Sequence, residues 1–141
     1  MSRNLLIIKK SMGELLLAQV MGALLGFLGV LLGAFGAHYL KGKMSENQAR
    51  SFETGVRYQL FHAILLLVLS FNLSFTNPLE GYIVYAILWG TLLFSFSIYG
   101  LVLSEVYGRK WRFLGPVTPL GGLLLLVGWA LLGYSFIANL F

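Results

Sequence analysis

Residues 15–40 read LLLAQVMGALLGFLGVLLGAFGAHYL, a continuous apolar stretch that contains no Asp, Glu, Lys or Arg. A helix rises about 1.5 Å per residue, so about 20 apolar residues are enough to cross the hydrocarbon core of a bilayer. A cleaved signal peptide is the alternative, because Lys9 and Lys10 precede the stretch, but a signal peptide has a hydrophobic region of only about 7–15 residues. We therefore expect residues 15–40 to form an intact transmembrane helix.

The composition of the whole chain also indicates a membrane protein. Of its 141 residues, 58% are hydrophobic and only 11% are charged, and the mean hydropathy is +0.83. Soluble domains carry about 25% charged residues, and a chain this short cannot hide so much apolar surface in a water-soluble core. The absence of cysteine excludes disulfides, thiolate metal sites and cysteine nucleophiles. The basic residues lie at the ends of the apolar segments and form no stripe of the kind that binds nucleic acid.

Three more apolar segments, at about 55–75, 79–105 and 117–140, are separated by short polar connections. The pattern predicts an all-α polytopic membrane protein, a compact four-transmembrane-helix bundle that forms a single domain over residues 1–141. The sequence SENQ at 45–48 is typical of a capping box, and Glu46–Arg50 and Glu53–Arg57 have the i,i+4 spacing of helical ion pairs. We expect a short amphipathic helix to lead into the second span.

Two Pro-containing sequences predict where the last two helices begin. NPLE at 77–80 places Asn77 at an N-cap and Pro78 in the first turn, and TPLGG at 118–122 repeats this order with Thr118 and Pro119.

Glycines in the first span recur with the spacing 4-3-4-3, which at about 100° per residue places them on one narrow face of a helix. We interpret this face as a helix-packing seam, because missing side chains let two backbones approach closely in a membrane. The seam could be used within one chain or between protomers. His38 lies about 160° from the seam on the same helix. The glycines of the seam are Gly22, Gly26, Gly29, Gly33 and Gly36.

A polar stripe follows the start of the second span. Thr54, Tyr58 and His62 are spaced i, i+4, i+8, and Arg57 lies one residue off the stripe. An ionisable residue inside an apolar span suggests a function by default, whereas the simpler interpretation is a neutral imidazole bonded to a hydroxyl group. We expect the stripe and His38 to face the bundle interior. The hydroxyl groups considered as partners of His62 are those of Tyr58, Ser95, Ser97, Tyr99 and Ser104.

The sequence predicts no catalytic residue, no cofactor and no metal site. His38 lies near the end of its span and His62 lies deeper in the next one, so the two do not suit a shared haem, and neither has an Asp, Glu or Cys beside it to complete a metal site. There is no G-x-S-x-G motif for a serine nucleophile. A pocket for a quinone or a lipid headgroup, built from Arg57, Tyr58 and His62, stays open as an alternative.

Three blocks, LGAFGAHYL at 32–40, FETGVRYQLFHA at 52–63 and GPVTPLGGLLLLVGWALL at 115–132, resemble the signature of the small YwdK/YgdD-like membrane proteins. This family is domain of unknown function 423, with animal relatives called transmembrane protein 256, and the resemblance covers about residues 15–141. It implies a compact four-span protein of the bacterial inner membrane and brings no established activity.

We therefore interpret the chain as an integral membrane protein with a non-enzymatic role, which packs with itself or with other membrane proteins. The alternative is a protein that binds or modifies a small ligand or lipid through His38, Tyr58 and His62. The expected partners are the lipid bilayer and a homo-oligomer or larger membrane complex, with no nucleic acid. Basic residues are concentrated around loops 41–53 and 106–116, so the positive-inside rule predicts that these loops are cytoplasmic.

Overall fold

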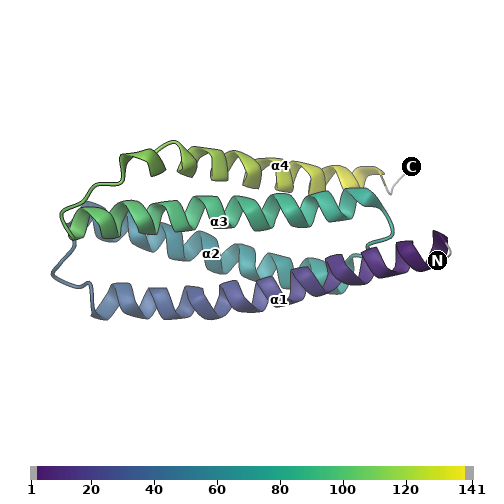
Figure 1. Cartoon of the computed structure of the whole chain (residues 1–141), viewed down its shortest axis with the longest axis horizontal. Helices are drawn as coiled ribbons and strands as arrows, with labels where there is room; N and C mark the ends of the chain where they lie inside the picture. Colours follow the sequence, from purple (N-terminus) through teal and green to yellow (C-terminus); the bar gives the residue numbers. More distant parts are fainter. Residues whose placement is uncertain (1–2, 139–141) are drawn as a thin grey trace.

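The computed structural model describes residues 3–138 and contains four long helices joined by short connections (Figure 1). All four are long and apolar enough to cross a membrane. They are α1 (Arg3–His38), α2 (Glu46–Asn72), α3 (Pro78–Val106) and α4 (Val117–Ala138), with a short 3-10 turn η1 (Arg112–Leu114) before α4.

Local sequence signals set most of the helix ends. The capping box predicted at the start of α2 is confirmed, because Ser45 accepts from the Gln48 backbone N–H while the Gln48 side chain accepts from that of Ser45. Asn77 caps α3, and Pro78 occupies its first turn as predicted. The fourth helix instead begins at Val117, so Thr118 is not its cap. The Thr118 hydroxyl lies 2.7 Å from the Ser97 hydroxyl of α3.

Two other boundaries differ from the prediction. The first helix begins at Arg3 rather than near residue 15, because the residues before the apolar stretch also favour a helix and include the i,i+4 pair Lys10–Glu14. The expected amphipathic helix is the first part of α2 itself, since nothing between Glu46 and the apolar span breaks the helix. At its other end α2 stops at Asn72, before Phe75, which adopts a positive φ of 54°.

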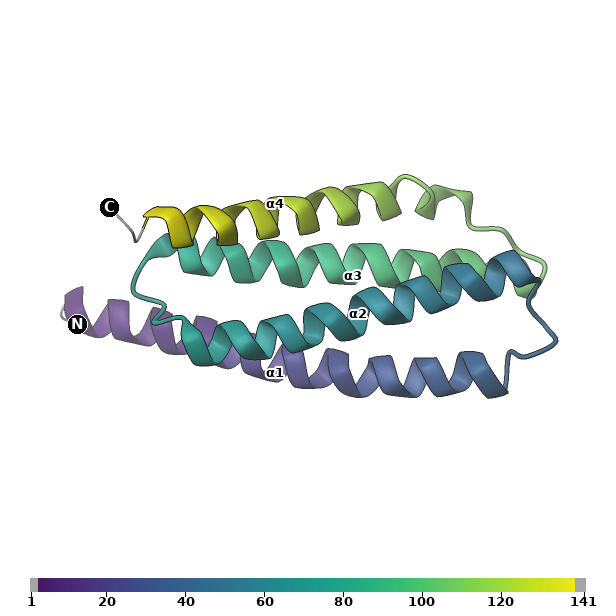
Figure 2. The ribbon, with the colours of Figure 1, turned by 180° about the vertical axis from the view of Figure 1, so that it is seen from behind.

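The helices pack in the order of the chain. The α3 helix lies between α4 on one side and the α1–α2 pair on the other, and α1 extends beyond its neighbours at its N-terminal end (Figures 1 and 2). Within the described residues the backbone of α4 packs only against α3 and η1. As a result α1 and α4 form the two edges of the molecule, and the core lies on α2 and α3, around Leu66, Ile83 and Ile87.

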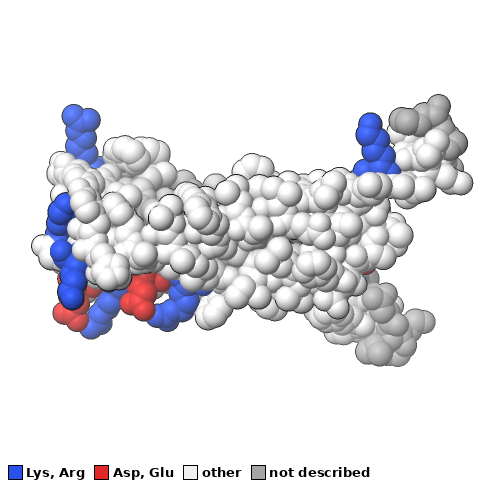
Figure 3. All heavy atoms as spheres, turned by 90° about the horizontal axis from the view of Figure 1, so that it is seen from below, with Lys and Arg blue, Asp and Glu red and all other residues white. Residues whose placement is uncertain are grey.

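Charged residues gather at the two ends and leave an uncharged band between them, as the face in Figure 3 shows. At the end that we call the basic end, the loops 39–45 and 107–116 lie beside the start of α2. The opposite end carries the N-terminal turns of α1 and the loop 73–77. The basic residues of the basic end are Lys41, Lys43, Arg50, Arg57, Arg109, Lys110 and Arg112.

Candidate functional site

His62 of α2 lies at the centre of the polar contacts in the membrane layer and is only 5% exposed. Its Nδ1 lies 2.7 Å from the Tyr58 carbonyl oxygen, and the Trp129 indole N–H of α4 donates to its Nε2 over 3.2 Å. A carbonyl oxygen can only accept and an indole N–H can only donate. The contacts therefore define a neutral imidazole with its proton on Nδ1, and both ring nitrogens are occupied.

Sequence reasoning considered only hydroxyl groups as partners of His62 and missed Trp129. The signal was weak: an indole N–H inside an apolar span needs an acceptor, but Trp129 is 51% exposed and its position in the chain does not pair it with His62. No hydrogen bond joins the His62 ring to a hydroxyl group in the part of the chain that the structure describes.

Gln59 is a second polar residue that the sequence analysis missed. It is fully buried, its amide N–H donates to the Leu25 carbonyl of α1 over 2.8 Å, and its carbonyl accepts from the Tyr99 hydroxyl of α3 over 2.8 Å. Nearby, Ser95 of α3 donates to the Gly55 carbonyl of α2 over 2.8 Å. These bonds connect α1, α2 and α3 at one level. Gln59 lies three residues before His62, a helical spacing that could have revealed it.

A third overlooked group is Glu14, a buried carboxylate of α1. It packs against Gly81 in the first turn of α3, where an added Cβ would lie 2.7 Å from Glu14 Oε1. Its partners are the Lys10 ammonium group at 3.8 Å and the positive N-terminal end of α3.

The predicted polar cluster does not come together as one site. His38 is exposed at the end of α1, so the prediction that it faces the bundle interior is wrong. The reason is that α2 lies against the glycine face of α1, which is opposite His38. Arg57 is exposed and pairs with Glu53 at 3.1 Å, and the half-buried Thr54 donates to the Arg50 carbonyl.

Tyr58 is also partly exposed, which differs from the expectation that the whole stripe is interior. Its ring lies 4.6 Å from the Phe94 ring and 5.9 Å from the His62 ring, measured between centroids. Of the predicted cluster, only Tyr58 and His62 are therefore neighbours in one hollow.

The five glycines of the seam on α1 lie along α2. A Cβ at Gly29 would lie 2.7 Å from Leu60 Cδ2, and one at Gly36 would lie 2.8 Å from the Phe52 ring. Gly26 has more room, since its added Cβ would meet only Ala63 at 4.0 Å. The described contacts of the seam are thus within one chain.

A lateral groove runs between α2 and α4, with α3 as its floor; we call it the α2–α4 groove. Its middle part has a volume of about 580 Å³, and Tyr58 and His62 line one wall while Trp129 and Pro119 line the other. The His62–Trp129 hydrogen bond crosses this part. Beside it, toward the basic end, lies a second hollow of about 460 Å³, which we call the polar hollow. Its lining includes Ser51, Thr54, Glu105, Lys110 and Thr118, together with the apolar residues Ile98, Leu101 and Val102 of α3.

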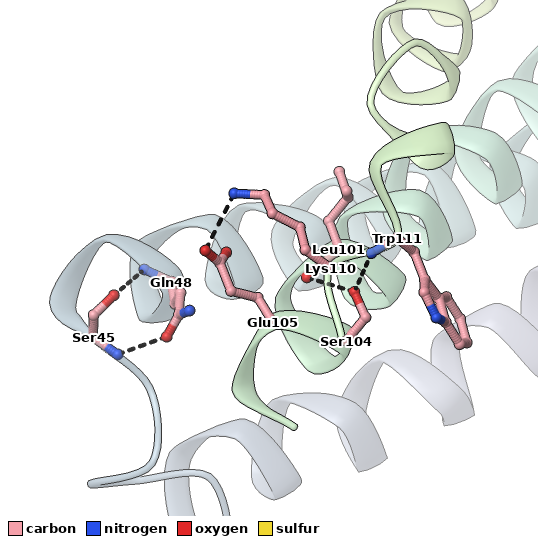
Figure 4. A network of polar contacts seen from close by, with 7 residues as sticks. All are labelled: Ser45, Gln48, Leu101, Ser104, Glu105, Lys110 and Trp111. Carbon is pink, nitrogen blue, oxygen red and sulfur yellow. Dashed lines mark hydrogen bonds and ion pairs between the residues drawn. The ribbon is translucent and has the colours of Figure 1, made fainter. Parts of the chain in front are cut away.

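The loop after α3 is held beside the polar hollow by side-chain contacts (Figure 4). Lys110 Nζ donates to Glu105 Oε1 over 3.2 Å, and the Trp111 backbone N–H donates to the Ser104 hydroxyl over 3.2 Å. Gln48 of the α2 capping box lines the same hollow. The Lys110 ammonium group and the Glu105 carboxylate therefore lie side by side at the boundary between the basic end and the apolar band.

Four apolar helices, charges at both ends and polar groups paired between helices define a small multi-pass helical membrane protein. The family model described as protein of unknown function (DUF423) matches residues 32–122. The UPF0382 inner membrane protein YgdD of Escherichia coli is 40% identical over 114 residues, which cover 80% of this chain and 83% of the relative. YwdK of Bacillus subtilis is 36% identical over 118 residues, and a UPF0382 membrane protein of Staphylococcus aureus is 37% identical over 116.

The chain belongs to this family, and the resemblance found in its sequence is confirmed. It is a multi-pass protein of the bacterial inner membrane, from a family whose biochemical role is unknown. No solved structure matches the chain.

Proposed function

We propose that the protein is a non-enzymatic structural component of the membrane, which packs with itself or with other membrane proteins. The observation that carries this proposal is the pairing of the buried polar groups inside the chain. Both ring nitrogens of His62 and both ends of the Gln59 amide have partners on other residues. Groups used in this way hold helices together and are not free to act as a base or nucleophile.

The two edge helices offer the surfaces for such packing. Each has a close helical neighbour on one side only, and Phe27 of α1 and Tyr134 of α4 are 67% and 60% exposed. A helix of another chain could pack against α1 or α4 at either edge without disturbing the polar contacts inside the molecule.

Site-specific photo-crosslinking in living cells tests this proposal. A photoreactive amino acid at Phe27 or at Tyr134 should give a discrete protein adduct at one or both edges, because these exposed side chains point away from the core. The same amino acid at Ile83, which is fully buried, serves as the control and should give no intermolecular adduct. Lipid adducts alone at both edges would contradict the proposal.

The alternative of a ligand-binding protein is favoured by one specific observation, the α2–α4 groove at Tyr58 and His62. His38 takes no part in it, since it is exposed at the far edge of the molecule. Ligand binding at this groove is compatible with packing at the edges, because the two use different surfaces.

A further inference from the structure

We infer that the α2–α4 groove binds one glycerophospholipid from the leaflet at the basic end. The lipid carries an amine-bearing zwitterionic headgroup, which occupies the polar hollow, and one acyl chain follows the groove to the His62–Trp129 hydrogen bond. The groove is a surface separate from the edges at Phe27 and Tyr134, neither of which lines it.

The polar hollow and the middle part of the groove are adjacent, because their lining residues follow one another along both walls. Thr54 lines the polar hollow and Tyr58, one helical turn further, lines the middle part, while on the other wall the neighbours Thr118 and Pro119 do the same. From Thr54 to His62 the distance along α2 is about 12 Å at 1.5 Å per residue. One leaflet contributes about 15 Å to the hydrocarbon core, so this stretch has the depth that an acyl chain occupies.

The hydrogen bond across the groove limits the width of the occupant. Trp129 Nε1 and His62 Nε2 are 3.2 Å apart, whereas a helix with its side chains is about 10–12 Å wide. A helix of another protein could lie on the α3 floor only if this bond broke. An acyl chain is a single file of CH₂ groups, and the apolar side chains of Phe94, Leu123 and Leu125 line its path.

The charges of the polar hollow favour a zwitterionic headgroup. Its lining contains one cation, Lys110, and one anion, Glu105, which are 3.2 Å apart. Because a partly exposed ion pair contributes little, it can be exchanged at small cost for two new pairs, phosphate with Lys110 and ammonium with Glu105. The other lining residues are five neutral polar ones, Asn47, Gln48, Ser51, Thr54 and Thr118, and three apolar ones, Ile98, Leu101 and Val102.

The hollow at the opposite end of the molecule does not complement a zwitterionic headgroup. Its hollow of about 710 Å³ is lined by polar residues that include Asn72, Asn77 and Glu80, but no Lys or Arg lines it in the part of the chain that the structure describes. A phosphate group has no cation to bind there. The leaflet at the basic end is therefore the source of the lipid.

Native mass spectrometry of the purified full chain tests the inference. Phosphatidylethanolamine, phosphatidylcholine and phosphatidylglycerol with identical acyl chains are added separately, and retained lipid adducts are measured. Phosphatidylethanolamine should be retained about tenfold more tightly than the other two, because it alone combines a cationic N–H donor for Glu105 with a phosphate for Lys110. The choline cation of phosphatidylcholine has no N–H, and the glycerol of phosphatidylglycerol donates hydrogen bonds but carries no positive charge. Lys110→Gln with Glu105→Gln should abolish this preference.

A matched pair of variants locates the site. Leu123 and Leu120 of α4 are equally exposed, at 57% and 56%, but only Leu123 lines the groove. Leu123→Trp should fill the groove and reduce phosphatidylethanolamine retention about tenfold, which corresponds to the loss of one strong contact, whereas Leu120→Trp should leave it unchanged. Equal retention of the three lipids, a preference for phosphatidylglycerol, or equal effects of the two Trp variants would each overturn the inference. None of these results would change the crosslinks expected at Phe27 and Tyr134, which lie outside the groove.

Discussion

Gln59 connects three helices through a single amide group. Its N–H reaches the Leu25 carbonyl of α1 and its oxygen accepts from the Tyr99 hydroxyl of α3, while Gln59 itself belongs to α2. Interhelical hydrogen bonds in membranes contribute only about 0.6 kcal/mol on average. The loss of stability is larger when only one partner is removed, because the other polar group then stays buried without a hydrogen-bond acceptor or donor.

Substitution of Gln59 tests whether leaving a buried polar group unpaired costs more stability than the hydrogen bond itself contributes. Gln59→Leu should lower the free energy of unfolding by about 1–3 kcal/mol, since the Tyr99 hydroxyl stays buried without an acceptor. Tyr99→Phe in the Gln59→Leu background should then cost less than Tyr99→Phe in the wild type. Thermal or denaturant unfolding of the four proteins in the same detergent measures the double-mutant cycle. Additive effects would show that the two side chains do not interact.

At the scale of the element, glycines decide how closely the helices approach. On α1 they accommodate Leu60 and Phe52 of α2, and on α4 Gly121 lies directly against the backbone of Phe94 in α3. These two contacts differ in how much they can adjust. A flexible side chain such as Leu60 can move, whereas the backbone of a packed helix cannot.

The α1 seam can be tested with a large side chain. Gly29→Leu should destabilise the protein by about 1–3 kcal/mol, because the new side chain must enter the space of Leu60. Gly133→Leu is the control, since Gly133 of α4 has no atom within 4 Å of an added Cβ. Unfolding in detergent compares the two variants, and equal stability would mean that the glycine face of α1 reflects composition only.

The α3–α4 contact offers a sharper comparison between adjacent residues. Gly121→Ala should be strongly destabilising, because its methyl group would collide with the Phe94 backbone. Gly122→Ala should be neutral or stabilising by up to about 1 kcal/mol, since its added Cβ meets the Phe94 ring at an ordinary distance of 3.7 Å and Ala favours a helix over Gly. Melting temperatures of the two variants measure the difference, and similar values would contradict the close contact.

At the scale of the whole molecule, four helices in a row place both ends of the described chain on one side of the membrane (Figure 1). The basic residues divide unequally between the two sides. The side of the termini has Arg3, Lys9 and Lys10, and the basic end has the seven defined above, from Lys41 to Arg112. Short basic loops remain preferentially in the cytoplasm.

We therefore predict that the basic end is cytoplasmic and that both termini face the outside of the inner membrane. A fluorescent protein that matures only in the cytoplasm, fused after Phe141, should remain dark. The same reporter inserted in the loop after α3, next to Gly108, should be bright and serves as the positive control. Bright fluorescence from the C-terminal fusion would reverse the assigned orientation.

The sequence determined those features that depend on neighbouring residues. Apolar length defined four spans, and the side chains of Ser45 and Asn77 defined the starts of α2 and α3, because hydropathy and capping act within one helix. The family blocks identified the class of protein, because each block is a short run of neighbouring residues that can be read directly from the sequence. His62 could be recognised as a buried polar residue, but its partner could not.

Only the tertiary structure decided which faces meet. In lipid, apolar surface gives little preference for one helix face over another, so packing depends on close backbone contact and on polar partners distant in the chain. This is why Trp129, 67 residues from His62, was missed, and why His38 was wrongly expected inside. It is also why the groove between α2 and α4 could not be derived from hydropathy, since α4 packs on α3 through the small residue Gly121 and leaves α2 uncovered.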